Sequence, residues 1–240
     1  MLIQLTVSRI IQVYLVQGVV GIFFLYLAYL ILRRDKKRLN VIFSGFYITG
    51  ALAVILNFIY APLTNETIVL WLNFFTNFMF AYAGIFLVVF NLILLKSEKI
   101  IDSKKQIAIL IGYGAALLSV MFFLFLEEPG VTLNADTGWR PVYTLPYYIY
   151  FMAILILGAI LPSLYLSWRI YTEFEDDLLK RKWRFFLLGL VIIDIFMIGT
   201  FTMNYINVDA IRDSWAIVSL FTIFSGPALI YYGVGKQLEQ

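Results

Sequence analysis

Residues 67–95 read TIVLWLNFFTNFMFAYAGIFLVVFNLILL and contain no charged side chain along their whole length. A helix that crosses the hydrocarbon core of a bilayer needs about 20 apolar residues, and this run exceeds that length. A helix on the surface of a soluble protein keeps charged residues on its exposed face. The run therefore indicates a transmembrane helix and places the chain among integral membrane proteins.

Six further apolar runs accompany this one, separated by charged or turn-forming residues. We predict seven transmembrane helices near residues 8–32, 40–61, 67–95, 106–126, 145–169, 184–205 and 214–235. These helices use most of the 240 residues, so we expect one all-α domain over residues 1–240, a polytopic seven-helix bundle. Residues 1–10 lack the basic segment and cleavage site of a secretory signal, so the first run should remain as the first helix.

Composition agrees with this class. The chain is 62% hydrophobic and 14% charged, whereas soluble domains carry about 25% charged residues. Of its 18 lysine and arginine residues, all but Arg9, Arg140 and Arg212 follow the first, third, fifth or seventh predicted helix. By the positive-inside rule the amino terminus is then outside and the carboxyl terminus cytoplasmic. We expect a multi-pass protein of the cell membrane, with the lipid bilayer as its main surroundings and no nucleic-acid partner.

Several kinds of chemistry are excluded by residues that the chain lacks. It has no cysteine and no histidine, which removes thiolate and imidazole ligands for metal or haem and the commonest general base. The predicted seventh helix has no lysine for a retinal Schiff base, and the helices carry no second aspartate for an intramembrane protease. We therefore expect no metal, no cofactor and no catalytic residues, and hence a protein that is not an enzyme.

Asp194 is the one acidic residue in the middle of a predicted helix. Ionisable groups at that depth are costly and commonly face a cavity or a partner. We expect a neutral acid that makes a hydrogen bond across the bundle. Its role is either a ligand-sensing or proton-coupling site or a packing contact, and the sequence leaves both open.

Asparagines define a second candidate site. Asn73 and Asn77 are four residues apart, so they lie on one helix face, which Gly84 and Asn91 continue. We expect this face to point into the bundle, towards Asn57 of the second helix. Amides in such positions either bind a polar ligand or hold helices together.

Tyr147 belongs to the tyrosine-rich start of the fifth helix, after the longest outer loop, residues 127–144. That loop is a natural lid for an outward-facing cavity, and Tyr147 is a candidate for its mouth or an interfacial residue. Pro162 and Pro227 each remove a backbone donor, so we expect kinks there that can serve as hinges.

The basic cluster Lys180, Arg181 and Lys182 lies on the cytoplasmic side in this orientation. It can contact anionic lipid or a cytoplasmic signalling protein. On the predicted fourth helix, Gly112 with Ala116 has the spacing of small residues at close helix contacts, which allows a homodimer.

The layout resembles the amino-terminal seven-helix sensor regions that precede histidine kinases and related output domains in bacteria and archaea. The resembling features are the basic loops after the first, third and fifth helices, the stretch RPVYTLPYY (140–148) and the acidic residues Asp209 and Asp213. The resemblance implies a prokaryotic sensor whose carboxyl end drives a cytoplasmic output. The chain carries no kinase region and no histidine phosphoacceptor up to Gln240, so the output is expected on another protein or on a longer chain.

These features lead to one favoured hypothesis and two alternatives. The favoured one is a receptor or sensor module that binds a small molecule or lipid within the bundle, contacts it through Asp194, Asn73, Asn77, Asn57 and Tyr147, and signals to a cytoplasmic partner. The alternatives are a small transporter or channel that uses Asp194 as its coupling carboxylate, and a membrane-anchor or assembly subunit of a larger complex.

Overall fold

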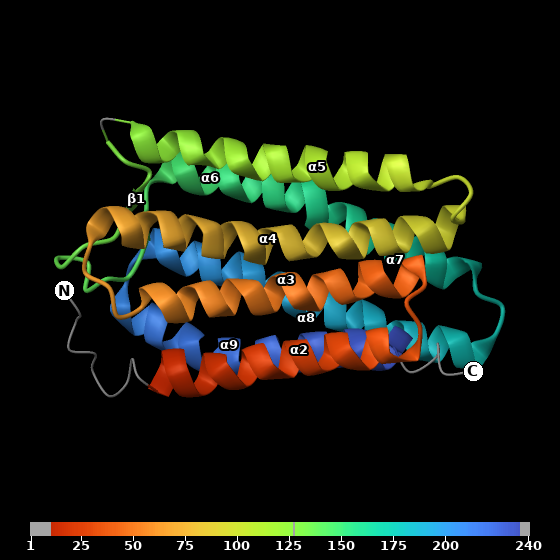
Figure 1. Ribbon diagram of the computed structural model, residues 1–240. Coiled ribbons are helices and arrows are strands. Elements are labelled where there is room, and N and C mark those ends of the chain that lie inside the picture. The colour runs from red at the N-terminus through yellow and green to blue at the C-terminus, as the bar shows by residue number, and fades with distance from the viewer. Residues whose placement is uncertain (1–10, 127, 236–240) are drawn as a thin grey trace.

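The computed structural model describes residues 11–126 and 128–235, which form a bundle of long helices running side by side (Figure 1). The helical segments are η1 (Ile11–Val16), α2 (Gln17–Arg34), α3 (Arg38–Tyr60), α4 (Glu66–Lys96), α5 (Ser103–Ser119), η2 (Val120–Phe125), α6 (Leu145–Leu155), η3 (Ile156–Ile160), α7 (Leu161–Glu173), α8 (Asp177–Ile206), α9 (Asp209–Ile230) and η4 (Tyr231–Gly235). A short antiparallel hairpin pairs β1 (Val131–Thr132) with β2 (Val142–Tyr143).

Seven helices of the described chain are long and apolar enough to cross a membrane, which confirms the all-α class and the number of candidate spans. They cover Val13–Arg34, Arg38–Tyr60, Glu66–Lys96, Ser103–Phe125, Leu145–Glu173, Asp177–Ile206 and Asp209–Val234. Each overlaps a predicted helix, although part of the first predicted helix, residues 8–10, lies outside the described residues.

Several helices extend beyond their apolar runs. The sixth begins at Asp177 rather than at 184, because the Asp176 carboxylate accepts hydrogen bonds from the backbone N–H groups of Leu178 and Leu179. The seventh begins at Asp209 rather than at 214. Acidic side chains stabilise the amino-terminal turn of a helix. Both helices therefore begin in the charged segment that precedes the apolar run.

The two ends of the bundle differ. The loops at residues 35–37, 97–102 and 174–176 lie at the end of the bundle where α9 is followed by η4, here called the basic end. The turn at residues 61–65 and the β1–β2 hairpin lie at the opposite end, here called the hairpin end (Figure 1).

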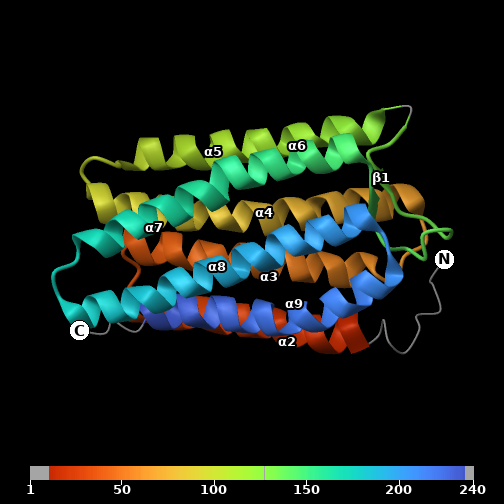
Figure 2. The same cartoon turned by 180° about the vertical axis from the view of Figure 1, so that it is seen from behind.

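The fifth span changes geometry before Pro162. Pro162 has no N–H to donate, and just before it the N–H of Leu161 donates to the carbonyl of Ile156, five residues back, in a π-type turn. Figure 2 shows the ribbon stepping sideways between α6 and α7 at this point. Pro227 lies inside α9, and its carbonyl accepts a hydrogen bond of 3.0 Å from the Tyr47 hydroxyl of α3.

Large apolar side chains fill the centre of the bundle and also cover its outside. Phe43 and Phe90 are fully buried, whereas Ile22, Phe122 and Phe221 are each at least 70% exposed. An apolar exterior of this kind is unfavourable in water. The surface pattern therefore fits a multi-pass membrane protein.

The closest approach of α8 and α9 depends on a glycine. A Cβ atom on Gly189 would lie 2.7 Å from the Gly226 carbonyl oxygen and 2.7 Å from the Ile230 nitrogen, both backbone atoms of α9. Backbone cannot turn aside as a side chain can, so any larger residue must separate the two helices.

We predict that Gly189→Ala lowers the stability of the bundle by about 1–3 kcal/mol, the usual range for overpacking in a tight core. The control is Gly112→Ala on α5, where a Cβ atom meets nothing within 4 Å and the change should be under about 1 kcal/mol. Thermal unfolding of both variants in the same detergent measures the difference. Equal melting temperatures would show that α8 and α9 are not in backbone contact.

Candidate ligand-binding pocket

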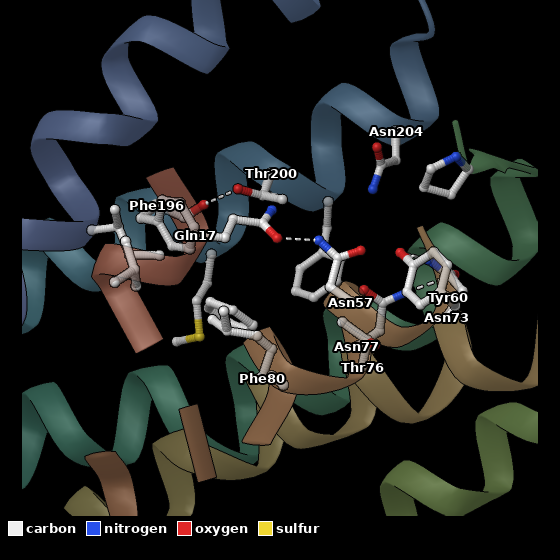
Figure 3. A pocket seen from close by; sticks show the side chains of 17 residues that line it. Gln17, Asn57, Tyr60, Asn73, Thr76, Asn77, Phe80, Phe196, Thr200 and Asn204 are labelled. Carbon is white, nitrogen blue, oxygen red and sulfur yellow. Dashed lines mark hydrogen bonds between the residues drawn. The ribbon is translucent and has the colours of Figure 1, made fainter. Parts of the chain in front are cut away.

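A cavity of about 180 Å³ lies within the bundle, towards the hairpin end (Figure 3). It far exceeds the ~10–15 Å³ that one buried water needs. Five helices and the hairpin loop line it through Gln17, Val20, Ala53, Val54, Asn57, Tyr60, Asn73, Thr76, Asn77, Phe80, Pro141, Phe196, Met197, Thr200, Phe201, Asn204 and Ile223. We call this cavity the carboxamide pocket.

The lining is polar but uncharged. Five of its side chains are carboxamides, one from α2, one from α3, two from α4 and one from α8, and none is a carboxylate, ammonium or guanidinium. Each carboxamide offers donors and an acceptor. The pocket is thus suited to a ligand that forms hydrogen bonds and carries no net charge.

Hydrogen bonds between neighbouring helices hold these amides in place. The Asn57 amide donates to the Gln17 carbonyl oxygen, which joins α3 to α2 (Figure 3). The Asn73 amide donates to the Tyr60 hydroxyl at 3.0 Å, and the Asn77 amide donates to the Asn73 carbonyl oxygen at 3.0 Å. The four-residue spacing of Asn73 and Asn77 places them one above the other on α4.

The Tyr143 hydroxyl extends this network across the bundle. It accepts hydrogen bonds from Asn77 of α4 at 3.0 Å and from Asn204 of α8 at 3.2 Å. Burial raises the pKa of the Tyr143 phenol, because the phenolate would lose its hydration. The hydroxyl therefore stays protonated and connects the hairpin to both helices.

Arg212 fastens the hairpin loop over the pocket. Its Nη2 donates to the Pro141 carbonyl at 2.7 Å and to the Asn204 carbonyl oxygen at 3.0 Å. Arg140 adds exposed contacts to Asp209 at 3.4 Å and Asp213 at 3.7 Å. Because Pro141 and Asn204 both line the pocket, Arg212 acts as a latch between its lid and its wall.

Three polar atoms of the lining have no hydrogen-bond partner among the described residues. They are the Gln17 amide nitrogen, the Asn57 carbonyl oxygen and the Asn77 carbonyl oxygen, whose other amide atoms are engaged as described above. The NH2 group of Gln17, with two N–H donors, and two carbonyl oxygens are thus available to a ligand.

Three of the predicted site residues meet in this pocket. Asn57, Asn73 and Asn77 line it, as their common orientation towards the bundle interior suggested. Tyr147 does not line it: the side chain is 1% exposed and packs edge-on against Phe123. The residue of this tyrosine-rich stretch that reaches the pocket network is Tyr143.

Asp194 also lies outside the pocket lining. Its side chain is 6% exposed, and Oδ2 has no hydrogen-bond partner among the described residues, so the hydrogen bond expected across the bundle is missing at that atom. Asn91, farther along the asparagine face, is fully buried and donates to the Ser163 carbonyl at 3.2 Å. It joins α4 to α7 and is remote from the pocket lining.

The basic cluster Lys180, Arg181 and Lys182 lies in the first turns of α8, at the basic end. Arg181 is exposed, and the other two are half-buried. The same helix carries Thr200 and Asn204 at the pocket, so α8 spans the whole distance between the two sites.

Several pocket residues were not identified from the sequence. Thr200 and Asn204 of α8 have the same four-residue spacing as Asn73 and Asn77, so the argument used for α4 could have found them. Gln17 is a polar residue inside an apolar run and gave a similar signal. Pro141 is brought to the pocket only by the fold of the loop, which no helical spacing predicts.

Comparison of the chain with models of protein families, with curated proteins and with solved structures finds no match. Among residues 11–126 and 128–235 there is no group of three or more carboxylate, cysteine or histidine side chains placed to hold a metal ion.

We predict that Arg212→Met loosens the hairpin loop. Removing a charged donor leaves the Pro141 and Asn204 oxygens unsatisfied, at a cost of about 1.5–3 kcal/mol, so backbone amides of residues 128–141 should exchange with deuterium about 10- to 150-fold faster. In the control Arg140→Gln, only exposed ion pairs worth about 0–1 kcal/mol are lost, and exchange should rise less than fivefold. Equal effects of the two variants would contradict the latch.

Proposed function

We propose that this protein is a non-enzymatic seven-helix membrane receptor that binds a small uncharged molecule in the carboxamide pocket and signals from its basic end. The observation that carries the proposal is the pocket itself, which is lined by five helices, four of which contribute carboxamides and none a charged side chain. Ligand sites in helical bundles are usually built between helices from a few placed polar groups in apolar surroundings.

A ligand in this pocket contacts several helices at once. Gln17, Asn57, Asn77 and Asn204 come from four different helices, so one molecule that bonds to several of them alters their spacing. A ligand shifts such a bundle only by the difference in its affinity for the two arrangements. Movement of α8 at Asn204 reaches Lys180 at the basic end through a single helix, the segment expected to contact a signalling partner.

The proposed orientation follows from the basic residues: the hairpin end faces outside, and the basic end faces the cytoplasm of a cell membrane. The carboxamide pocket then lies in the outer half of the bilayer, on the side of an extracellular or membrane-borne ligand.

A transporter that uses Asp194 remains the second candidate, favoured by its buried carboxyl oxygen without a partner among the described residues. Its position outside the pocket lining favours the receptor. An anchor subunit would present polar residues such as Asn77 and Asn91 on its outer surface to a partner, whereas Asn77 lines the pocket and Asn91 is fully buried. Substrate flux in proteoliposomes that vanishes in Asp194→Asn would establish the transporter instead.

The orientation can be tested because the chain has no cysteine of its own. We predict that a membrane-impermeant maleimide labels Asp136→Cys in intact cells and labels Lys99→Cys only after the membrane is opened. Both positions are exposed and lie at opposite ends of the bundle. The reverse labelling pattern would place the hairpin end in the cytoplasm and overturn the proposed orientation.

The binding function is tested by gentle purification followed by native mass spectrometry. We predict that the wild-type protein retains an uncharged small molecule, and that Asn77→Leu loses it because a pocket acceptor and two hydrogen bonds of the wall are removed. The matched control is Asn91→Leu, the same substitution on the same helix but away from the pocket, which should retain the molecule. Equal occupancy in the two variants, or a molecule of net charge, would contradict the proposal.

A further inference from the structure

A second hollow lies on the outside of the bundle, between α2 and α9. It is an open apolar groove lined by Phe23, Leu220, Phe221, Phe224, Ser225 and Ala228. Its one polar side chain, Ser225, already donates to the Phe221 carbonyl within its own helix. Helices α2 and α9 lie side by side in both views of the bundle (Figures 1 and 2), so the groove follows their seam.

The groove is separated from the carboxamide pocket by this seam alone. On α2, Val20 lines the pocket, and Phe23, about one turn further along, lines the groove. On α9, Ile223 lines the pocket, and the next residue, Phe224, lines the groove. The rings of Phe23 and Phe224 pack against each other, with 5.7 Å between centroids, and close the seam between the two hollows. Helix α2 packs mainly on α3 and only lightly on α9, so the seam is one of the weaker contacts of the bundle.

The polar pocket lies nearer the hairpin end of the bundle than the apolar groove does. This is the order in which the head group and the chain of a lipid lie in one leaflet. Gln17, with its free amide nitrogen, lies about 9 Å nearer the hairpin end than Phe23, at the helical rise of 1.5 Å per residue. The pocket thus holds polar groups towards one face of the membrane, and the groove runs from there towards its middle.

The chemistry of the pocket restricts the head group. An anionic or cationic head would lose its hydration against a lining without any opposite charge, which is strongly unfavourable. The free groups are the NH2 of Gln17, which donates, and the carbonyl oxygens of Asn57 and Asn77, which accept. A head with two O–H or N–H donors and an acceptor oxygen, such as a glycerol or an ethanolamide, satisfies them.

We infer that the ligand of the proposed receptor is an uncharged single-chain amphiphile, a hydroxyl- or amide-headed lipid of the monoacylglycerol or acylethanolamide type. Its head occupies the carboxamide pocket, its chain separates the rings of Phe23 and Phe224 and lies in the α2–α9 groove, and it enters from the bilayer. This inference rests on the binding function proposed above and adds the class of ligand and its route.

The test uses the full chain in phosphatidylcholine nanodiscs and a monoacylglycerol that carries a photoreactive diazirine in its chain. After illumination, mass spectrometry should find the label on residues 217–228 of α9 and 20–26 of α2. Unlabelled 1-oleoylglycerol should compete with the label, and oleate, with the same chain and a charged head, should not.

Variants separate the groove from general lipid contact. Ser225 is exposed on the groove, so Ser225→Trp fills it without touching the pocket lining, and competition by 1-oleoylglycerol should weaken at least about tenfold as several methylenes lose their contacts. Ile217→Trp is the matched control on the same helix, 63% exposed and outside the groove, and should compete like the wild type.

The inference is overturned if 1-oleoylglycerol does not compete, if oleate competes equally, or if Ser225→Trp and Ile217→Trp behave alike. Native mass spectrometry then decides the fate of the proposed function separately. A small polar molecule retained by Ser225→Trp and lost from Asn77→Leu would leave the receptor standing with a ligand that does not use the groove.

Discussion

A carboxamide buried among apolar helices is costly unless its N–H groups and its oxygen have hydrogen-bond partners. The Tyr143 hydroxyl meets this requirement for two helices at once, accepting from Asn77 of α4 and Asn204 of α8. Arg212 then fixes the oxygen of Asn204 and the backbone of Pro141. The wall and the lid of the pocket are therefore one hydrogen-bonded network.

The rest of the bundle is organised differently. Away from the pocket, contacts between helices are mainly apolar and tight, as where Gly189 lets the backbones of α8 and α9 approach. Buried aromatic rings such as Phe43 and Phe90 stack between α3 and α4 at a centroid distance of 4.8 Å. Such interiors resist continuous deformation. A change at the hairpin end is thus carried by whole helices towards the basic end rather than absorbed between them.

The sequence predicted the helices better than the site because the two depend on different information. An uncharged run such as residues 67–95 has one viable conformation in a bilayer, since every backbone group must be bonded within the helix. The inward position of Asn73 and Asn77 followed from spacing on one helix. By contrast, the role of Tyr143 depends on how the loop folds back over the bundle. Tyr147 and Asp194 do not line the pocket because of the helices that surround them. These are contacts between distant segments, which local periodicity does not contain.

The absence of charge from the pocket lining bears on the proposed receptor function. A buried ion pair commits several kcal/mol to one arrangement of the helices, whereas hydrogen bonds between helices in membranes average about 0.6 kcal/mol each. An amide that leaves Asn73 or Tyr143 for a ligand exchanges one modest bond for another. The free-energy difference between arrangements of such a network is small, so a ligand that engages two or three amides is sufficient to shift their populations. A neutral pocket built from carboxamides is therefore suited to a reversible receptor in a way that a charged pocket is not.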